Sequence, residues 1–265
     1  MKDIATVSTT KYILDKYNLN ALKKFGQNFL VDTNIINNII TEAKVDNNTV
    51  VLEVGVGLGS LTQQLSNNAY KVFGFEIDER FKEVHQEFLN RDNIEIIYGD
   101  YLKTDIKDII NSYQDKRIIM ISNVPYYITT DIIKKTLESS IQEMYLMVQK
   151  EVAIKFSSDT KMPLNMMIDY LGGCKYLFTV SKQVFIPKPN VDSAIMYIYK
   201  DKEYNPKLYS LLQDSFTQKR KTIYNNLKGY PNIKEYLLKA GIQENDRAEN
   251  IPLDKYLKLL EVMEK

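Results

Sequence analysis

The sequence has 265 residues with 44% hydrophobic and 26% charged side chains and a formal net charge of +1, a balance typical of globular proteins. No apolar run approaches the roughly 20 residues that cross a bilayer, which excludes a membrane-spanning protein. One histidine and one cysteine, His85 and Cys174, exclude an internal disulfide and the usual zinc ligand sets.

Cysteine usage and the first residues indicate the compartment. A single cysteine fits a reducing environment, and residues 1–20 contain acids without an apolar block and cleavage site, so no signal peptide is expected. We therefore expect a cytoplasmic protein without a metal. His85 lies in RFKEVHQEFL, a largely polar helical pattern, and is expected to be a solvent-exposed helix residue.

Short β-rich runs alternate with helical patterns in the first part of the chain, which predicts a parallel sheet covered on both faces. Asp78 is expected to cap a helix. Gly172-Gly173 precede two further β-rich runs, 178–185 and 193–200, which predict a hairpin at the sheet edge. The fold class is therefore α/β, doubly wound. The expected strands of the alternating part are 49–54, 71–77, 94–100, 117–124 and 144–149, and the expected helices are 60–69, 78–90 and 129–140.

The β signal stops near Lys200. Three helical stretches follow, 205–227, 232–241 and 252–265, separated by glycine and proline. We therefore predict a large domain over residues 1–200 and a small all-helical domain over residues 201–265.

A glycine-rich loop follows the first expected strand in VLEVGVGLGSLTQQL. Gly55, Gly57 and Gly59 would let the backbone turn sharply and let a ligand approach closely. A dinucleotide fingerprint, G-x-G-x-x-G, would need glycine at position 60, where the chain has Ser60. The observed E-x-G-x-G-x-G pattern instead matches class I S-adenosylmethionine-dependent methyltransferases. A tight turn alone also accounts for such glycines.

Two acids stand at the ends of the next two strands. Glu76 lies about 20 residues beyond the loop, where a carboxylate can accept both ribose hydroxyls. Asp100 ends the following strand, where its carboxylate could accept a hydrogen bond from an adenine amino group. Each acid alone could simply cap the next helix, but both at the carboxyl ends of consecutive strands favour a bound nucleoside.

The fourth expected strand delivers Asn123-Val124-Pro125-Tyr126 to the same edge. The Asn123 side-chain oxygen and the Val124 carbonyl could accept the two N–H bonds of an adenine amine and turn its lone pair toward a methyl donor. Pro125 removes a donor, and Tyr126 offers a face for an unstacked base. A strand end followed by a turn would be the simpler explanation of these four residues. The glycine-rich loop and the two acids Glu76 and Asp100 upstream argue against it.

With these residues the chain resembles the rRNA adenine N6,N6-dimethyltransferases, which include the KsgA family, acting on small-subunit rRNA, and the Erm resistance methylases, acting on large-subunit rRNA. The N-[LIV]-P-Y motif, KKFGQNFLVD (23–32), MVQKEVA (147–153) and FIPKPNVDSA (185–194) carry the resemblance over nearly the whole chain. It implies a Rossmann-like class I methyltransferase sheet and S-adenosyl-L-methionine as the cofactor.

The resemblance also implies residue roles. Phe185 would lie against the target adenine opposite Tyr126, although alone it would be taken for a core residue. Gln27 and Asn28 would meet the cofactor carboxylate. The full implied cofactor site is Gln27, Asn28, Leu30, Glu53, Gly55, Gly57, Gly59, Glu76, Ile77, Asp100, Tyr101 and Asn123.

The C-terminal part distinguishes the two branches. FTQKRKTIYNNL (216–227) and DRAENIPLDKY are similar to KsgA-type segments. The implied RNA contacts are Lys23, Lys24, Lys219, Arg220 and Lys221, although a solvated helix face would also explain the basic run. Val56 replaces a usual proline, Lys219 replaces an arginine, and residues 157–170 lack the family pattern.

The sequence thus predicts a monomeric dimethyltransferase acting on N6 of two adjacent adenines of 16S rRNA in small ribosomal subunit particles, with a role in small-subunit biogenesis. One alternative is an Erm-type 23S rRNA methylase that gives macrolide resistance. Another is a non-catalytic RNA-binding assembly factor on the same fold. A DNA adenine methylase is a further alternative, but it would need a recognition domain larger than the small helical domain predicted here.

Overall fold

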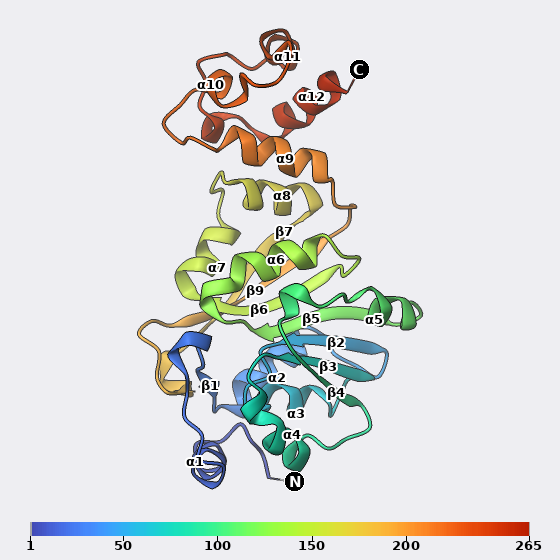
Figure 1. The fold of residues 1–265 in the computed structure, drawn as a ribbon, viewed down its shortest axis with the longest axis vertical. Coiled ribbons are helices and arrows are strands. Elements are labelled where there is room, and N and C mark those ends of the chain that lie inside the picture. The colour runs from blue at the N-terminus through green and yellow to red at the C-terminus, as the bar shows by residue number, and fades with distance from the viewer. Residues whose placement is uncertain (1, 265) are drawn as a thin grey trace. The chain divides into compact units, whose positions relative to one another are not determined.

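The computed structural model describes residues 2–264 (Figure 1). The chain divides into two compact units. The first contains the residues up to Ser157 together with 175–198, and the second contains 158–174 together with the chain from Tyr199 onward. The chain passes from the first unit to the second at Tyr199, next to the predicted boundary at residue 200, and the second unit also includes residues 158–174. The division into two domains stays a prediction.

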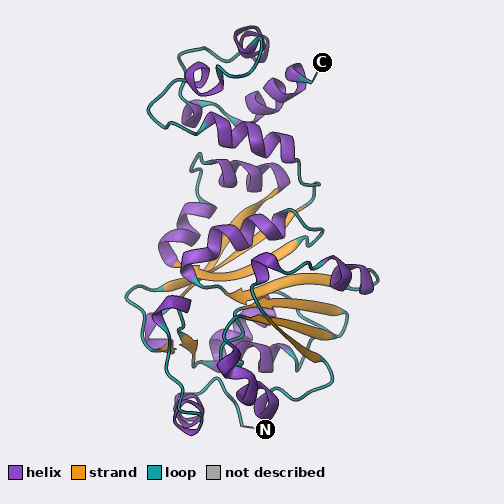
Figure 2. Cartoon of the chain, in the orientation of Figure 1, coloured by secondary structure: helices purple, strands orange, loops and turns teal. Residues whose placement is uncertain are grey.

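A seven-stranded sheet forms the centre of the fold (Figure 2). Its strand order is β4-β3-β2-β5-β6-β9-β7. Every residue of β2 is buried, as expected of a central parallel strand covered on both faces. The five strands predicted before residue 150 are confirmed, and pairing among them is parallel. They are β2 (Thr49–Val54), β3 (Lys71–Glu76), β4 (Ile94–Tyr98), β5 (Arg117–Asn123) and β6 (Glu143–Gln149).

The last two strands at one side of the sheet are β9 (Ser193–Lys200) and the outermost strand β7 (Gly172–Val180). They lie side by side at the sheet edge, as predicted, with β9 next to β6. The expected strand 178–185 is wrong in its bounds, because β7 begins at Gly172 and ends at Val180. A Cβ atom at Gly172 would lie 2.4 Å from the Tyr199 carbonyl oxygen, so this glycine allows the close approach of the two backbones.

Helices surround the sheet, and the predicted ones are present as α3, α4 and α6. The Asp78 cap is confirmed, since its side chain accepts a hydrogen bond from the Arg80 amide. A separate two-stranded sheet pairs β1 (Phe29–Leu30) with β8 (Phe185–Ile186). The helices before residue 158 are α1 (Val7–Lys16), α2 (Thr33–Glu42), α3 (Ser60–Leu65), α4 (Lys82–Phe88), α5 (Lys107–Ser112), α6 (Thr129–Leu137) and α7 (Lys150–Ser157). Single 3-10 turns are η1 (Lys23–Phe25), η2 (Glu79–Phe81), η3 (Tyr101–Lys103), η4 (Tyr126–Ile128) and η5 (Lys182–Val184).

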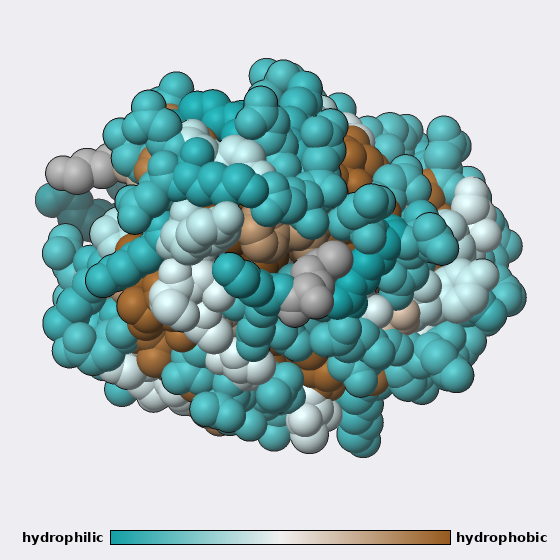
Figure 3. All heavy atoms as spheres, turned by 90° about the horizontal axis from the view of Figure 1, so that it is seen from below, coloured by the Kyte–Doolittle hydropathy of each residue, from teal (hydrophilic) through white to brown (hydrophobic). Residues whose placement is uncertain are grey.

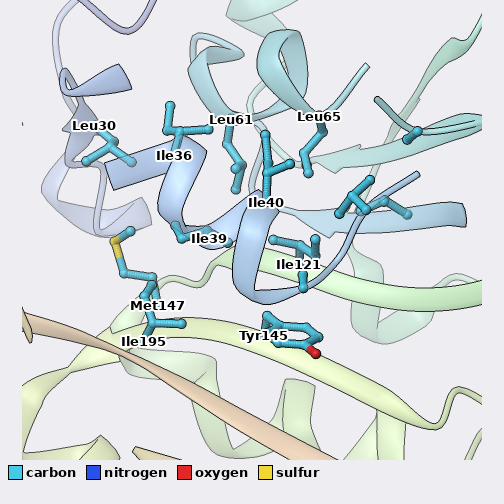
Figure 4. Close-up of a cluster of buried hydrophobic side chains, with 14 of the residues drawn as sticks. Leu30, Ile36, Ile39, Ile40, Leu61, Leu65, Ile121, Tyr145, Met147 and Ile195 are labelled. Atoms are coloured by element: carbon cyan, nitrogen blue, oxygen red, sulfur yellow. The ribbon is translucent and has the colours of Figure 1, made fainter. Parts of the chain in front are cut away.

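A core of aliphatic side chains joins α2 and α3 to the sheet (Figure 4). Isoleucines of α2 meet leucines of α3 and side chains from β5, β6 and β9. Full burial of one such side chain contributes about 1.5–3 kcal/mol. This core anchors the strand ends from which the loops of the site begin. The labelled members are Leu30, Ile36, Ile39, Ile40, Leu61, Leu65, Ile121, Tyr145, Met147 and Ile195.

The second unit is helical. The single stretch predicted over 205–227 is wrong, because α9 ends at Ser215 and α10 starts at Ile223. Asn226 holds the intervening turn by donating from Nδ2 to the Ser215 carbonyl at 2.6 Å, and Thr222 caps α10. The helices are α8 (Pro163–Leu171), α9 (Pro206–Ser215), α10 (Ile223–Leu227), α11 (Ile233–Ala240) and α12 (Leu253–Met263), with a 3-10 turn η6 (Ala248–Asn250).

Across residues 2–264, none of the helices combines the length and apolar character that crossing a membrane requires. Hydrophilic side chains cover most of the face seen in Figure 3, with smaller hydrophobic areas between them.

Candidate active site

A cavity with about 990 Å³ of space free of protein atoms opens at the carboxyl ends of β2, β3 and β5, in the first unit. The strand order reverses here, since β2 pairs with both β3 and β5, and such crevices are where open α/β sheets bind ligands. The lining of the cavity includes most of the predicted residues, namely Gln27, Asn28, Leu30, Glu53, Gly55, Gly57, Glu76, Ile77, Asp100, Tyr101, Asn123, Val124, Pro125 and Tyr126.

The three glycines of the loop have different positions. All have left-handed backbones, with φ of 84° at Gly55, 57° at Gly57 and 93° at Gly59, so side chains there would be strained. Gly55 and Gly57 line the cavity, but Gly59 does not. A Cβ atom at Gly59 would lie 2.6 Å from Leu89 Cδ1. Gly59 therefore permits close packing at the start of α3, and its role as a cofactor contact stays a prediction.

The Glu76 carboxylate faces the cavity and is only 4% exposed. Its Oε2 accepts a hydrogen bond from the Gly57 amide at 2.7 Å, and its Oε1 accepts one from the Asp78 amide at 2.8 Å. Burial raises the pKa of Glu76 to about 7, against the lowering effect of these amides. A buried carboxylate with free lone pairs is stabilised by neutral hydroxyl donors, which fits a ribose diol.

Glu53 is a second buried acid in the lining, 1% exposed. The Thr62 hydroxyl donates to its Oε2 at 2.6 Å. Burial, together with a smaller effect of the nearby Glu76, raises the pKa of Glu53 to about 8, against the lowering effect of the Thr62 hydrogen bond. Glu53 is therefore held largely protonated at neutral pH and can itself donate a hydrogen bond.

Asp100 both caps a turn and lines the cavity. Its Oδ1 accepts from the Leu102 amide at 3.0 Å, at the start of η3. Asp100 can therefore cap the turn with one oxygen and bind a ligand with the other, because a carboxylate has two acceptor oxygens. Within residues 2–264, His, Cys, Asp and Glu side chains form no group of three or more that could hold a metal ion.

Gln27 and Asn28 border the cavity, with their amides engaged inside the protein. Gln27 donates from Nε2 to Asp78 Oδ2 at 2.8 Å and accepts from the Leu22 amide at 2.8 Å. Asn28 donates to the Gly26 carbonyl at 3.0 Å. These bonds fix the segment before β1 against the loop that follows β3.

The Asn123 side chain has a defined orientation. Its Nδ2 donates to the Asn28 carbonyl at 3.3 Å, which leaves Oδ1 as the acceptor. Val124, 1% exposed, donates its amide to the Met147 carbonyl at 3.2 Å. The Tyr126 phenol oxygen lies 2.7 Å from Ser193 Oγ, and this contact fixes the ring. Sequence reasoning missed Tyr127, whose ring is 58% exposed and also lines the cavity. The second tyrosine of PYYIT was the available signal.

His85 contradicts the sequence prediction. The side chain is 4% exposed instead of solvated. Its Nε2 lies 2.8 Å from the Gly57 carbonyl oxygen, and its Nδ1 lies 2.6 Å from the Tyr98 hydroxyl. Burial lowers the pKa of His85 to about 4. The available signal was the apolar spacing around it, because Phe81, Val84 and Phe88 share one helix face with His85 and are buried with it.

Comparison with known proteins identifies the family. A sequence model described as "Ribosomal RNA adenine dimethylase" matches residues 18–265. The chain belongs to this family. "Ribosomal RNA small subunit methyltransferase A" of Bacillus pumilus (strain SAFR-032) is 38% identical over 287 residues, which cover 100% of this chain and 98% of that protein. The protein of the same name from Staphylococcus aureus (strain JH9) is also 38% identical, over 100% and 97%.

Solved structures of rRNA adenine dimethylases and related methyltransferases have the same fold. A dimethyladenosine transferase from Plasmodium falciparum aligns with a TM-score of 0.72 and 25% identity, over 89% of this chain and 97% of that one. The 23S rRNA methyltransferase ErmE aligns with a TM-score of 0.67 and 26% identity, over 90% and 100%. The Rossmann-like class I methyltransferase fold is thereby confirmed.

One residue role implied by the dimethylase family does not match the geometry. Phe185 is 3% exposed and belongs to the core cluster, since β8 places it opposite Leu30 in the pairing with β1. It does not line the cavity. Its contact with a base stays a prediction, and that contact requires β8 to move. Tyr127 is the more accessible ring.

The residues of this chain that the family resemblance implies as RNA contacts lie at two places. Lys24 Nζ lies 4.6 Å from the ring centre of Phe25, a cavity residue, whereas the side chain of Lys23 lies outside what the structure describes. Lys219, Arg220 and Lys221 are exposed on the turn between α9 and α10, not on a helix face. This turn is called the basic turn below.

Proposed function

We propose that the chain is an S-adenosyl-L-methionine-dependent dimethyltransferase acting on N6 of two adjacent adenines of 16S rRNA in small ribosomal subunit particles. One observation carries the proposal: Asn123 and Tyr126 border the same cavity as the glycine loop and the Glu76 carboxylate. The 38% identity to small-subunit methyltransferases A favours the small subunit as the substrate.

The residues present fit the cofactor. The Gly55 and Gly57 backbone would face its amino-acid part, Glu76 its ribose hydroxyls and Asp100 its adenine amine. Leu30, Ile77 and Tyr101 supply apolar surface in the lining. When bound, the cofactor supplies an electrophilic methyl group on a sulfonium.

The chain orients the acceptor amine. Asn123 Oδ1 accepts one N–H of adenine N6, because the amide nitrogen is already bonded to Asn28. The Val124 carbonyl is the second acceptor, and Pro125 has no amide hydrogen to compete. Both bonds draw electron density toward the amine nitrogen and align its lone pair for an in-line displacement. The proton is lost to water from a cationic product nitrogen, so no side chain is assigned as a general base.

Tyr126 holds the flipped base. The Ser193 contact fixes the ring plane, and stacking of a base on an aromatic ring contributes about 1–3 kcal/mol. Lys23, Lys24 and the basic turn, Lys219–Lys221, contact RNA phosphates. Such contacts add affinity without reading sequence. An enzyme with this ribosomal substrate acts in the cytoplasm and takes part in small-subunit biogenesis. We propose a monomer as the active form.

An Erm-type activity on 23S rRNA is the second candidate. The ErmE structure favours it, because it aligns over 90% of this chain at 26% identity. Such an enzyme would methylate large-subunit rRNA and confer macrolide resistance when expressed.

One transfer experiment tests both functions. Labelled S-adenosylmethionine is supplied with unmethylated small subunits, large subunits or naked rRNA, for the wild type and Asn123→Ala. Asn111→Ala, on the exposed face of α5, is the matched control. We expect dimethyladenosine in small-subunit particles, retained in the control and reduced at least 100-fold in Asn123→Ala, an effect of the size of removing one oriented transition-state contact.

The other outcomes are equally decisive. Label in 23S rRNA would move the chain to the Erm branch. Cofactor binding without transfer to any substrate would contradict an enzyme and leave an RNA-binding assembly factor.

A further inference from the structure

We propose that His85 is a positioning residue that holds the Gly57 peptide in the orientation needed for cofactor binding. This inference rests on the proposed function, because the cavity beside Gly57 is taken as the S-adenosylmethionine site. His85 belongs to α4, Tyr98 to β4 and Gly57 to the loop after β2. Three elements distant in sequence thus meet at one buried imidazole.

The hydrogen-bond partners determine the tautomer. The Gly57 carbonyl can only accept, so the Nε2 atom at 2.8 Å must carry the proton. In a neutral imidazole Nδ1 is then an acceptor, and the Tyr98 hydroxyl at 2.6 Å donates to it. Burial lowers the pKa of His85 to about 4, which agrees with a neutral ring at pH 7.

Gly57 joins this bond to the cavity. Its carbonyl accepts from His85, while its amide donates to Glu76 Oε2 at 2.7 Å. Gly57 has a φ of 57° and no side chain to fix it. The Glu76 bond holds the peptide before its Cα atom, Val56–Gly57, and the His85 bond holds the peptide after it, Gly57–Leu58. The result is a continuous series of donors and acceptors from Tyr98 through His85 and Gly57 to Glu76.

A purely space-filling role does not explain these contacts. Leucine has similar bulk, but it would leave the Gly57 carbonyl without its side-chain donor and the half-buried Tyr98 hydroxyl without its acceptor. The Gly57–Leu58 peptide could then rotate, and the change in backbone torsion at Gly57 would disturb the neighbouring amide that bonds Glu76. Loss of one such bond at a binding site weakens affinity by about tenfold.

The chain has one histidine, which makes a direct spectroscopic test possible. In untagged protein with ¹⁵N-labelled histidine, the imidazole nitrogens give one unambiguous set of NMR signals. We expect the neutral Nε2–H tautomer at pH 7 and a shift of these signals when S-adenosylhomocysteine is added. A Nδ1–H tautomer or a charged ring would overturn the proposal.

Three variants test the function of the bond. His85→Leu removes both hydrogen bonds, His85→Gln keeps one donor and one acceptor, and Tyr98→Phe removes the outer partner. Gln86→Leu, an exposed neighbour on α4, is the control. Calorimetric Kd values for S-adenosylmethionine should rise about tenfold in His85→Leu and recover at least partly in His85→Gln. Tyr98→Phe should raise Kd by about threefold, since it leaves the Nε2 bond.

Steady-state kinetics separate positioning from general destabilisation. We expect the KM for the cofactor to rise in His85→Leu while kcat at saturation and the KM for RNA stay within about twofold. Equal Kd values for the wild type and folded His85→Leu would overturn the proposal, as would equal weakness of the Leu and Gln variants. If His85→Leu does not fold, Tyr98→Phe and His85→Gln decide. Failure of the wild type to bind the cofactor would instead refute the proposed function.

Discussion

Glu53→Gln should stabilise the protein increasingly as the pH rises. The folded state raises the pKa of Glu53 from 4.5 to about 8, chiefly by burial. The folded protein therefore binds this proton more tightly than the unfolded chain does. The stabilising contribution is complete below pH 4.5 and is lost as the pH rises toward 8. Glutamine has the shape of the protonated acid and can keep the Thr62 hydrogen bond.

The magnitude follows from the two pKa values. Between pH 5 and pH 7 the wild type should lose about 2–3 kcal/mol of unfolding free energy through this one carboxyl, since a shift of one pKa unit corresponds to about 1.4 kcal/mol. Glu53→Gln should not show this loss. Urea unfolding of the cofactor-free protein at both pH values measures it, with exposed Glu83→Gln as the control. Because Glu76 titrates in both proteins, the difference between them isolates Glu53. A difference that is the same at both pH values, or that falls with pH, would refute the reasoning.

Two further predictions concern the RNA. Tyr127→Ala should raise the KM for small-subunit particles about tenfold through lost stacking and leave the cofactor Kd unchanged. The control Tyr12→Ala, which also replaces an exposed tyrosine, should change neither constant. An unchanged KM for Tyr127→Ala would show that its ring does not contact RNA. Replacing all three cations of the basic turn by glutamine should make the plot of log affinity against log salt concentration less steep, by about 2 in the absolute value of its slope. Filter binding at several salt concentrations measures this slope. A slope equal to that of the wild type would mean that the turn makes no phosphate contacts.

The sequence predicted the sheet well because buried parallel strands have a strong local signal. The run 49–54 matches β2 at both ends, since six consecutive buried β-rich residues lie between turn residues. The cavity followed from the strand ends, because topology alone brings Gly55, Glu76 and Asn123 together.

The errors have two causes. At His85 the polar side chain concealed a readable pattern, because Phe81, Val84 and Phe88 mark its helix face as buried, and the contacts with Gly57 and Tyr98 are what allow an imidazole there. The break between α9 and α10 depends on Asn226 reaching back to Ser215, which no helical period records.

The interrupted second unit has a consequence for synthesis of the chain. The helix α8 packs against α9, yet the 34 residues 172–205 separate the end of α8 at Leu171 from the start of α9 at Pro206. At translation rates of about 5–20 residues per second, α8 waits roughly 2–7 s for this partner. During that time its apolar side chains, among them Leu164 and Ile168, lack their α9 contacts. A nascent chain halted near residue 200 would therefore be a ready client for chaperones, even though every lining residue of the cavity has already been made.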